Sequence, residues 1–275
     1  MDEETIKKAV RFLKDDIRAT PTIGIVCGTG REDLSDHMKL CRSLRYNEIP
    51  GFPCPRGYGH PGSVIHGYLG QKYVVGMETR LRSFDGYPAD LCAAPIVILR
   101  RLGVRTLIIT AMASKLSEGY AAGDIMLVKD HIYIPGIFGN GVKVGEKDNR
   151  SGVKHFPKEN MYNEKLRDLF HIAAQQVEHR PVLHDGIYAM IGGPACATET
   201  EMKFLRSLDA DAVGMGICHE VVTAYGCGME VVAVVVLGDQ YGKYLQRRLD
   251  YETTVKYKQS SKQVLSIVAK LVNFL

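Results

Sequence analysis

The chain has 275 residues, which is long enough for one large domain, and we expect a single domain over residues 1–275. Hydrophobic residues make up 45% of it and charged residues 24%, which are ordinary globular proportions and argue against a disordered tail protein. The formal net charge of +4 is too small and too evenly spread to indicate a nucleic-acid or membrane partner.

The start of the chain, its longest apolar run and the spacing of its cysteines together predict a cytoplasmic protein. The first residues are acidic and then amphipathic, without the apolar core of a signal peptide. The longest apolar run, Val231–Leu237, is far shorter than a membrane span. The 7 cysteines are scattered and form no CxxC pair, which is typical of reduced thiols. We therefore expect a cytoplasmic protein with no disulfide framework and no metal site.

Short β-branched runs alternate along the chain with longer segments of helical periodicity. The expected strands are Thr22–Cys27, Tyr73–Met77, Thr106–Thr110, Ile125–Val128, Ile187–Ile191 and Val231–Leu237. The expected helices are Glu3–Asp16, Ala89–Leu102, Asn163–Val177, Glu199–Leu208, Glu220–Tyr225 and Thr253–Phe274. This alternation predicts an α/β fold of packed layers with a mainly parallel central sheet. The Gly-rich stretch Pro135–Pro157 is predicted to be one long surface loop.

A glycine-containing turn follows the first expected strand, at Cys27-Gly28-Thr29-Gly30. Glycines there let backbone N–H groups approach an anion, and Thr29 adds a hydroxyl donor. The turn is neither a GxGxxG motif nor a Walker A loop. The alternative interpretation is a tight exit from a strand with no ligand.

A second candidate anion site combines His60, in the turn Gly59–Gly62, with Arg80, which follows the strand Tyr73–Met77. An arginine fork fits phosphate oxygens, so the two side chains suit a phosphate clamp. The alternatives are a loop histidine bonded to backbone and a surface arginine in an ion pair. A third turn, Gly192-Gly193-Pro194, precedes a helix that Thr198 or Thr200 caps.

These pieces, in this order, resemble the trimeric purine nucleoside phosphorylase family, which includes methylthioadenosine phosphorylase. The matching stretches are IGIVCGTG at Ile23–Gly30, EIPGFP at Glu48–Pro53, Gly59–Gly62, DGYP at Asp85–Pro88, GDIMLVKDHIYIPG at Gly123–Gly136, Gly192–Pro194 and DADAVGM at Asp209–Met215. The resemblance implies a single-domain three-layer α/β sandwich around a central mixed, mainly parallel sheet. It also implies a homotrimer.

The resemblance implies phosphorolysis of a nucleoside to a free base and ribose 1-phosphate. The substrates would be a small-molecule nucleoside and inorganic phosphate, with phosphate as co-substrate and no metal or organic cofactor. The enzyme would hold phosphate under the sugar and stabilise the departing base, which is positioning combined with electrostatics.

The family's phosphate ligands correspond to four residues of this chain: Thr29, His60, Arg80 and Met112. Thr29 stands where the family usually has Ser. The family's Asn-Ala-Ala-Gly turn reads Ala111-Met112-Ala113-Ser114 here, so its Asn is lost. A phosphate-contacting serine is replaced by Gly216.

The sugar site also departs from the family, whose C-terminal His, which bonds the sugar 5′-hydroxyl, has no counterpart in Tyr244–Gln259. Met215 matches the family, but Phe84 stands where the family has a ribose-contacting Tyr. The phenylalanine that a neighbouring subunit lends to the family's site aligns with Gly152.

The base site departs further. Cys196 stands where the family has an aromatic residue stacked beside the base, and Ala197 stands where the family has a purine-binding Glu. Asp239 replaces the Asn that bonds purine N7, as in the branch that prefers 6-aminopurines. With His60, it is the predicted catalytic residue, and it would have to carry a proton at one stage. The alternative is an Asp that caps the strand end or pairs with Lys243.

Two hypotheses for function are considered, and the first is favoured because it is the activity that the resemblance implies. The first is an active phosphorylase with altered base preference. The second is a catalytically impaired relative that binds a nucleoside, another small anion or a protein partner. Loss of one transition-state donor typically costs about 10²–10³ in rate, which favours the second hypothesis unless the losses are replaced. Lys115, next to the altered turn, would be such a replacement, and the alternative is a solvated lysine.

Overall fold

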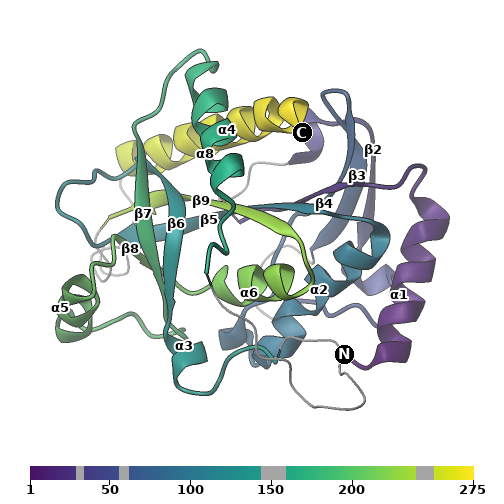
Figure 1. Cartoon of the computed structure of the whole chain (residues 1–275), viewed down its shortest axis with the longest axis horizontal. Helices are drawn as coiled ribbons and strands as arrows, with labels where there is room; N and C mark the ends of the chain where they lie inside the picture. The colour runs from purple at the N-terminus through teal and green to yellow at the C-terminus, as the bar shows by residue number, and fades with distance from the viewer. Residues whose placement is uncertain (29–33, 56–61, 144–158, 240–250) are drawn as a thin grey trace.

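The structure is a computed structural model, and it describes residues 1–28, 34–55, 62–143, 159–239 and 251–275 (Figure 1). Within these ranges, nine strands form one mixed sheet in the order β2-β3-β4-β1-β5-β8-β7-β6-β9. The strands are β1 (Ile23–Val26), β2 (Lys39–Arg45), β3 (Ser63–Leu69), β4 (Lys72–Met77), β5 (Thr106–Lys115), β6 (Ile125–Tyr133), β7 (Leu183–Met190), β8 (Ala212–Gly214) and β9 (Glu230–Gly238).

One part of the sheet closes into a ring. Besides its place at the end of the strand order, β9 pairs in parallel with β5, from Thr106 opposite Glu230 to Ser114 opposite Gly238. The ring therefore runs from β5 through β8, β7, β6 and β9 back to β5. Strands β1 and β4 extend the sheet from β5 in parallel, whereas β3 and β2 continue it antiparallel.

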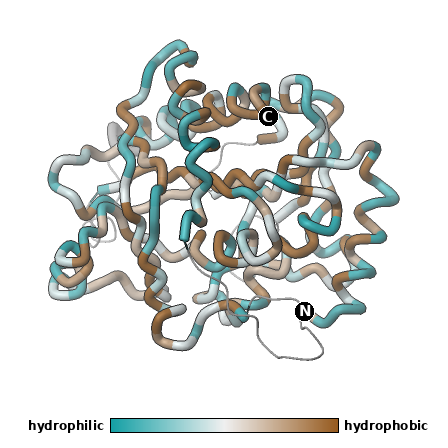
Figure 2. The backbone as a smooth tube through the Cα atoms, in the orientation of Figure 1, coloured by the Kyte–Doolittle hydropathy of each residue, from teal (hydrophilic) through white to brown (hydrophobic). Residues whose placement is uncertain are grey.

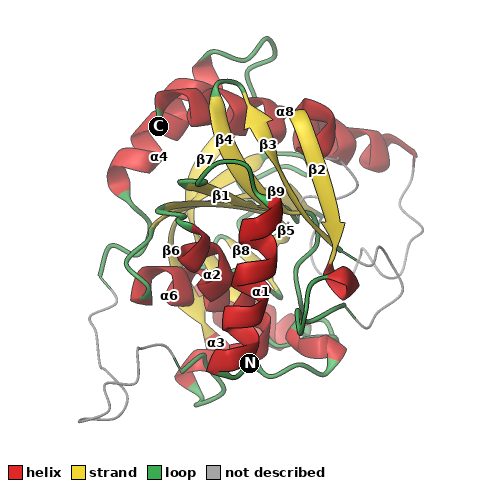
Figure 3. Cartoon of the chain, turned by 90° about the vertical axis from the view of Figure 1, so that its right-hand side faces the viewer, coloured by secondary structure: helices red, strands yellow, loops and turns green. Residues whose placement is uncertain are grey.

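Helices cover both faces of the sheet, which gives the three layers predicted (Figure 1). One face packs against α1 (Glu3–Asp16), α2 (Ala89–Leu102) and α6 (Cys218–Gly226), and the other against α4 (Glu164–Gln175) and α8 (Tyr251–Phe274). Figure 3 shows α1 next to α2 and α6, with α8 across the far side of the strands. The short helix α5 (Glu199–Ser207) packs on a separate apolar cluster beside β8.

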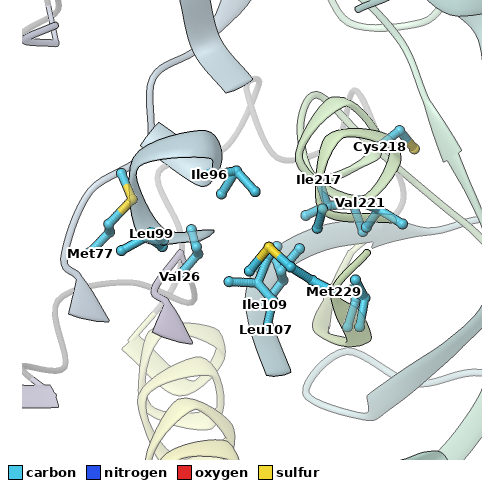
Figure 4. Packing of buried hydrophobic residues seen from close by; sticks show 14 of the residues in the cluster. Val26, Met77, Ile96, Leu99, Leu107, Ile109, Ile217, Cys218, Val221 and Met229 are labelled. Carbon is cyan, nitrogen blue, oxygen red and sulfur yellow. The ribbon is translucent and has the colours of Figure 1, made fainter. Parts of the chain in front are cut away.

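The apolar residues gather where these layers meet. Figure 2 shows the central strands as largely hydrophobic and the outer side of α1 as hydrophilic. Strand β9 is buried from Val231 to Gly238, as expected for a strand covered on both faces. Figure 4 shows Ile217 and Val221, at the start of α6, facing Leu107 and Ile109 of β5. Packing in the core thus fixes the position of the start of α6.

Local signals explain where several helices begin. The Asp2 carboxylate accepts from the N–H of Thr5 at 2.7 Å and starts α1. Thr198 and Glu201 form a capping box that starts α5, which resolves the choice between Thr198 and Thr200 in favour of Thr198. None of the helices in the described ranges is both long and apolar enough to cross a membrane.

The structure corrects two expectations. Residues Ala111–Ser114 are not a turn, because β5 continues through them to Lys115. Pairing with β9 on one side and with β8 at its end extends this strand. The stretch Pro135–Pro157 is not loop throughout, since the helical turn α3 (Ile134–Ile137) includes its first residues. Residues 144–158 of that stretch lie outside the described residues.

Candidate active site

Arg80 lies buried after β4, at the carboxyl ends of the parallel strands, with 7% of its surface exposed. Its Nη2 donates to the backbone carbonyl oxygen of Thr110 at 2.8 Å. A Cβ atom at Gly28 would lie 2.9 Å from Arg80 Cζ, and one at Gly216 would lie 3.3 Å from Arg80 Nη1. The guanidinium is therefore packed between two glycines, so it is not the surface ion pair considered from sequence.

Thr110, a buried residue of β5, joins this arrangement to the end of β1. Its hydroxyl oxygen accepts from the backbone N–H of Gly28 at 3.2 Å, and its carbonyl oxygen accepts from Arg80. The ends of β1 and β4 are thus tied to β5 by one residue. A guanidinium has five N–H donors, and among the described residues Arg80 has one hydrogen bond, from Nη2, so Nη1 has no hydrogen-bonded acceptor there. Nη1 is therefore the part of Arg80 that could meet an anion, and the phosphate-binding role of Arg80 stays a prediction.

Glu220 lies on the other side of Arg80, in the first turn of α6, and is 2% exposed. Its Oε1 is 3.5 Å from Arg80 Nε, while its Oε2 has no hydrogen-bond partner among the described residues. The neighbouring His219 is equally buried, and burial together with the Arg80 charge lowers the pKa of its imidazole, although Glu220 opposes this. His219 is therefore neutral at pH 7.

A strained turn brings α6 to this position. Ile217, which precedes α6, has φ +70°, a value that a β-branched residue rarely adopts. Such a conformation costs about 1–3 kcal/mol and persists where the surrounding structure determines it. Ile217 is fully buried. The turn places Gly216 on one side of Arg80 and Glu220 on the other.

A second group of predicted residues meets beside the first. Met215 follows β8, and Phe84 lies in the 3-10 turn Ser83–Asp85. A Cβ atom at Gly193 would lie 2.5 Å from Met215 Sδ and 3.0 Å from Phe84 Cδ1, so both side chains pack on this glycine. The exposed Arg82 places its guanidinium 5.4 Å from the centroid of the Phe84 ring. Met215 is joined in the chain to Gly216, whose Cβ position lies 3.3 Å from Arg80 Nη1.

Cys196 and Ala197, the two residues before α5 that are predicted to contact the nucleoside base, have different surroundings. Cys196 is half-buried, whereas Ala197 is buried in the apolar cluster that contains Leu205 of α5 and Val213 of β8. Both come just before α5, so helix capping at Thr198 fixes their positions. No described hydrogen bond involves a side chain at either position.

Asp239 directly follows β9 and is exposed. Its backbone N–H donates to the hydroxyl of Tyr257 on α8 at 2.8 Å. The preceding Gly238 lies opposite Ser114 of β5, and Val213 of β8 pairs with the same Ser114. Asp239 is thus at the end of β5 that also meets β8. Lys243, its alternative partner, lies outside the described residues.

Three further positions on or after β5 were considered from sequence. Met112 is half-buried and packs against the cluster beneath α8, and Ala111 is buried on the opposite cluster. Lys115 donates from Nζ to the carbonyl oxygen of Tyr120 at 2.5 Å. This bond argues against Lys115 as the replacement for the missing Asn. Thr29, His60 and Gly152 lie outside the described residues, so their predicted roles stay predictions.

Sequence reasoning missed Thr110 and Glu220 as members of this arrangement. Thr110 ends an apolar strand run, where a single hydroxyl gives little signal. Glu220 gives a clearer signal in the sequence, because it is an acidic residue in the mainly apolar segment Cys218–Ala224. A carboxylate on a buried helix face requires a partner.

Comparison with known proteins agrees with this fold. A sequence model of the phosphorylase superfamily matches residues 22–273. The chain therefore belongs to the phosphorylase superfamily, and within it to the purine nucleoside phosphorylases.

Three relatives illustrate the match. Purine nucleoside phosphorylase 1 of Geobacillus stearothermophilus is 32% identical over 262 residues, which cover 94% of each chain. The Anopheles gambiae enzyme is 36% identical over 230 residues, which are 84% of this chain but 65% of the relative. The crystal structure of Schistosoma mansoni purine nucleoside phosphorylase with inosine superposes with a TM-score of 0.88 at 32% identity, covering 100% of this chain and 97% of that one.

Proposed function

We propose that this chain catalyses phosphate-dependent cleavage of a (deoxy)ribonucleoside to a free base and ribose 1-phosphate. A phosphate oxygen forms a bond to the anomeric carbon while the bond from that carbon to the base nitrogen breaks. The electron pair of the broken bond stays on the base, which then takes up a proton. The observation that carries this proposal is the buried Arg80 fork, held between Gly28 and Gly216 at the carboxyl ends of the strands.

The described residues suit the parts of that reaction. Arg80 would bind phosphate through its Nη1 side, with Thr29, His60 and the backbone at Met112 as further predicted ligands. Phe84 and Met215 would pack against the sugar, because both side chains lie against Gly193 and Met215 adjoins Gly216, which faces Arg80. Asp239 would face the base and donate or accept its proton. The step needs no metal or organic cofactor, since phosphate itself is the co-substrate.

Base preference follows from two replacements. Ala197 offers no carboxylate to a purine and lies in an apolar cluster. Asp239 is therefore the predicted acidic residue at the base, and a carboxyl group can serve both N7 and a 6-amino group. We propose a preference for 6-aminopurine nucleosides over 6-oxopurine nucleosides. We also propose a cytoplasmic homotrimer of single-domain subunits, as the family resemblance implies.

A second candidate function is binding without turnover. It is favoured by Ala111 and Ala197, which replace polar family residues, and by the bond that ties Lys115 to Tyr120. These observations leave Arg80 and Glu220 as the charged groups of the described anion site. The anion or nucleoside would then bind without phosphorolysis.

Base release decides between the two functions. Adenosine, inosine, guanosine and uridine are incubated with the protein, with and without phosphate, and the free base is measured by chromatography. Release of adenine that requires phosphate supports the proposal, and equal release from inosine contradicts the base preference. Arg80→Lys keeps the charge but not the fork, so it should lose most of the activity. Arg100→Lys is the matched control, since Arg100 also donates to a backbone carbonyl oxygen, of Cys227, at the other end of α6.

A further inference from the structure

Glu220 and Arg80 form an ion pair that is cut off from solvent on the Glu220 side. Only 2% of Glu220 and 7% of Arg80 is exposed. The distance of 3.5 Å from Oε1 to Nε is that of an ion pair without good hydrogen-bond geometry, and Oε2 has no partner among the described residues. A buried carboxylate so poorly hydrogen-bonded is stabilised chiefly by the positive charge beside it.

The surroundings of Glu220 offer it little else. The residues that follow it, Val221 and Val222, are in the apolar core (Figure 4 shows Val221). His219 is neutral at pH 7, so it does not compensate the carboxylate. The Cys92 thiol on α2 has a pKa raised to about 12, by burial first and then by the charge of Glu220. The negative charge of Glu220 therefore reaches the contact between α2 and α6.

With phosphate bound, the same guanidinium would have two anionic partners on two sides. Glu220 faces Nε, and phosphate is proposed to bind at Nη1, beside Gly216. Before phosphate binds, Glu220 compensates the buried Arg80. After it binds, Glu220 and phosphate repel each other across one guanidinium, because like charges in a low-dielectric interior interact strongly.

We propose that Glu220 is the resident counter-ion of the anion site, which stabilises the protein before phosphate binds and weakens phosphate binding. This inference rests on the proposed function, because it assumes that phosphate is the anion bound by Arg80. It assigns Glu220 a positioning role that acts through Arg80 and sets the phosphate affinity. A carboxylate that only fills space would have no such effect.

The test compares Glu220→Gln with Thr223→Val. Glutamine keeps the shape and one acceptor oxygen but removes the charge. Thr223 is a matched control, since it lies three residues further on α6, is buried, and has a hydroxyl without a partner among the described residues. Melting temperatures are measured with and without phosphate, and the phosphate KM and kcat are measured at saturating nucleoside.

We expect Glu220→Gln to melt at a lower temperature without phosphate and to gain more from added phosphate than the wild type. Its phosphate KM should fall by roughly three- to tenfold, the size expected for removing one nearby like charge. Thr223→Val should leave the phosphate KM unchanged. A phosphate KM that is unchanged or raised in Glu220→Gln would overturn the inference, as would an equal loss of melting temperature with and without phosphate.

A second pair of variants serves if Glu220→Gln does not fold. Arg80→Gln strands the carboxylate, so adding Glu220→Gln should restore part of the lost melting temperature. A further, additive loss of melting temperature would overturn the pairing of Glu220 with Arg80.

The proposed function and the inference about Glu220 can fail separately. A wild-type protein that phosphate stabilises but that releases no base contradicts the proposed function, while the melting comparison still tests Glu220. A wild-type protein that phosphate does not stabilise overturns the inference about Glu220.

Discussion

Arg80 donates a hydrogen bond from Nη2 to the backbone carbonyl oxygen of Thr110, at 2.8 Å. The hydroxyl of the same Thr110 accepts from the N–H of Gly28 at 3.2 Å. One buried residue of β5 therefore positions both the guanidinium and the turn after β1. The anion site depends on this residue, although Thr110 need not touch an anion itself.

Replacing Thr110 by valine should destabilise the protein and loosen the anion site. The change keeps the shape of the side chain but leaves the Gly28 N–H without its acceptor, which costs about 1 kcal/mol. Urea denaturation measures this loss, and phosphate titration followed by melting measures the weaker binding. Thr110→Ser keeps the hydroxyl and is the control. Equal loss of phosphate binding in both variants would show that the hydroxyl has no part in it.

Arg80→Lys should lose the stabilisation that phosphate gives to the wild type. Lysine keeps a positive charge near Glu220, so the fold is expected to survive, but it lacks the planar fork that matches two phosphate oxygens. Arg80→Ala is a poorer test, because removing one partner of a buried pair costs about 3–5 kcal/mol. The measurement is the shift in melting temperature on adding phosphate. An unchanged shift in Arg80→Lys would remove the fork from the site.

Gly216→Ser should strengthen phosphate binding. A Cβ atom at this position would lie 3.3 Å from Arg80 Nη1, so a serine hydroxyl would stand beside the proposed phosphate. One added hydrogen bond contributes about 0.5–1.5 kcal/mol, which lowers the phosphate KM by roughly two- to tenfold. Gly216→Ala adds the Cβ atom alone and is the control. If alanine lowers the KM as much as serine does, packing rather than the hydroxyl is responsible.

His219 should make the protein less stable in mild acid. Burial lowers the pKa of its imidazole below the ordinary value of 6.5. As the pH falls below that value, the unfolded chain takes up a proton that the folded protein does not, so the free energy of unfolding decreases. Above it, both states are neutral and the contribution is complete. As the pH is lowered from 8 to 5, the melting temperature should therefore fall more steeply in the wild type than in His219→Gln. Parallel curves would contradict this.

The parts of the fold that local sequence determines were predicted well. Helices α1 and α2 have the predicted bounds, because caps and helical periodicity act over a few neighbouring residues. Strand β2 was missed because most of its side chains are exposed and charged residues interrupt it, so it has no apolar run. Strand β8 was missed because it has three residues. Its existence depends on pairing with β5 and β7, which sequence patterns do not record.

The positions of the candidate site residues, though not their roles, follow in part from the sequence for the same reason. Arg80, Met215 and Phe84 were identified through motifs, and the structure brings these motifs together at neighbouring strand ends. Glu220 was not identified, because its role comes from contact with Arg80, far away in the sequence. The continuation of β5 through Ala111–Ser114 was likewise hidden, since its pairing with β9 and β8 extends it.

The ring formed by β5, β8, β7, β6 and β9 has a consequence for self-association. Strands within a ring have both edges paired, so they offer no template on which another chain can add a strand. Among the described strands, β2 is the one at the open end of the sheet. It carries Lys39, Arg42 and Arg45, and such charges on an edge strand repel a second copy. The protein thus protects its sheet from aggregation by closure at one end and by positive charge at the other.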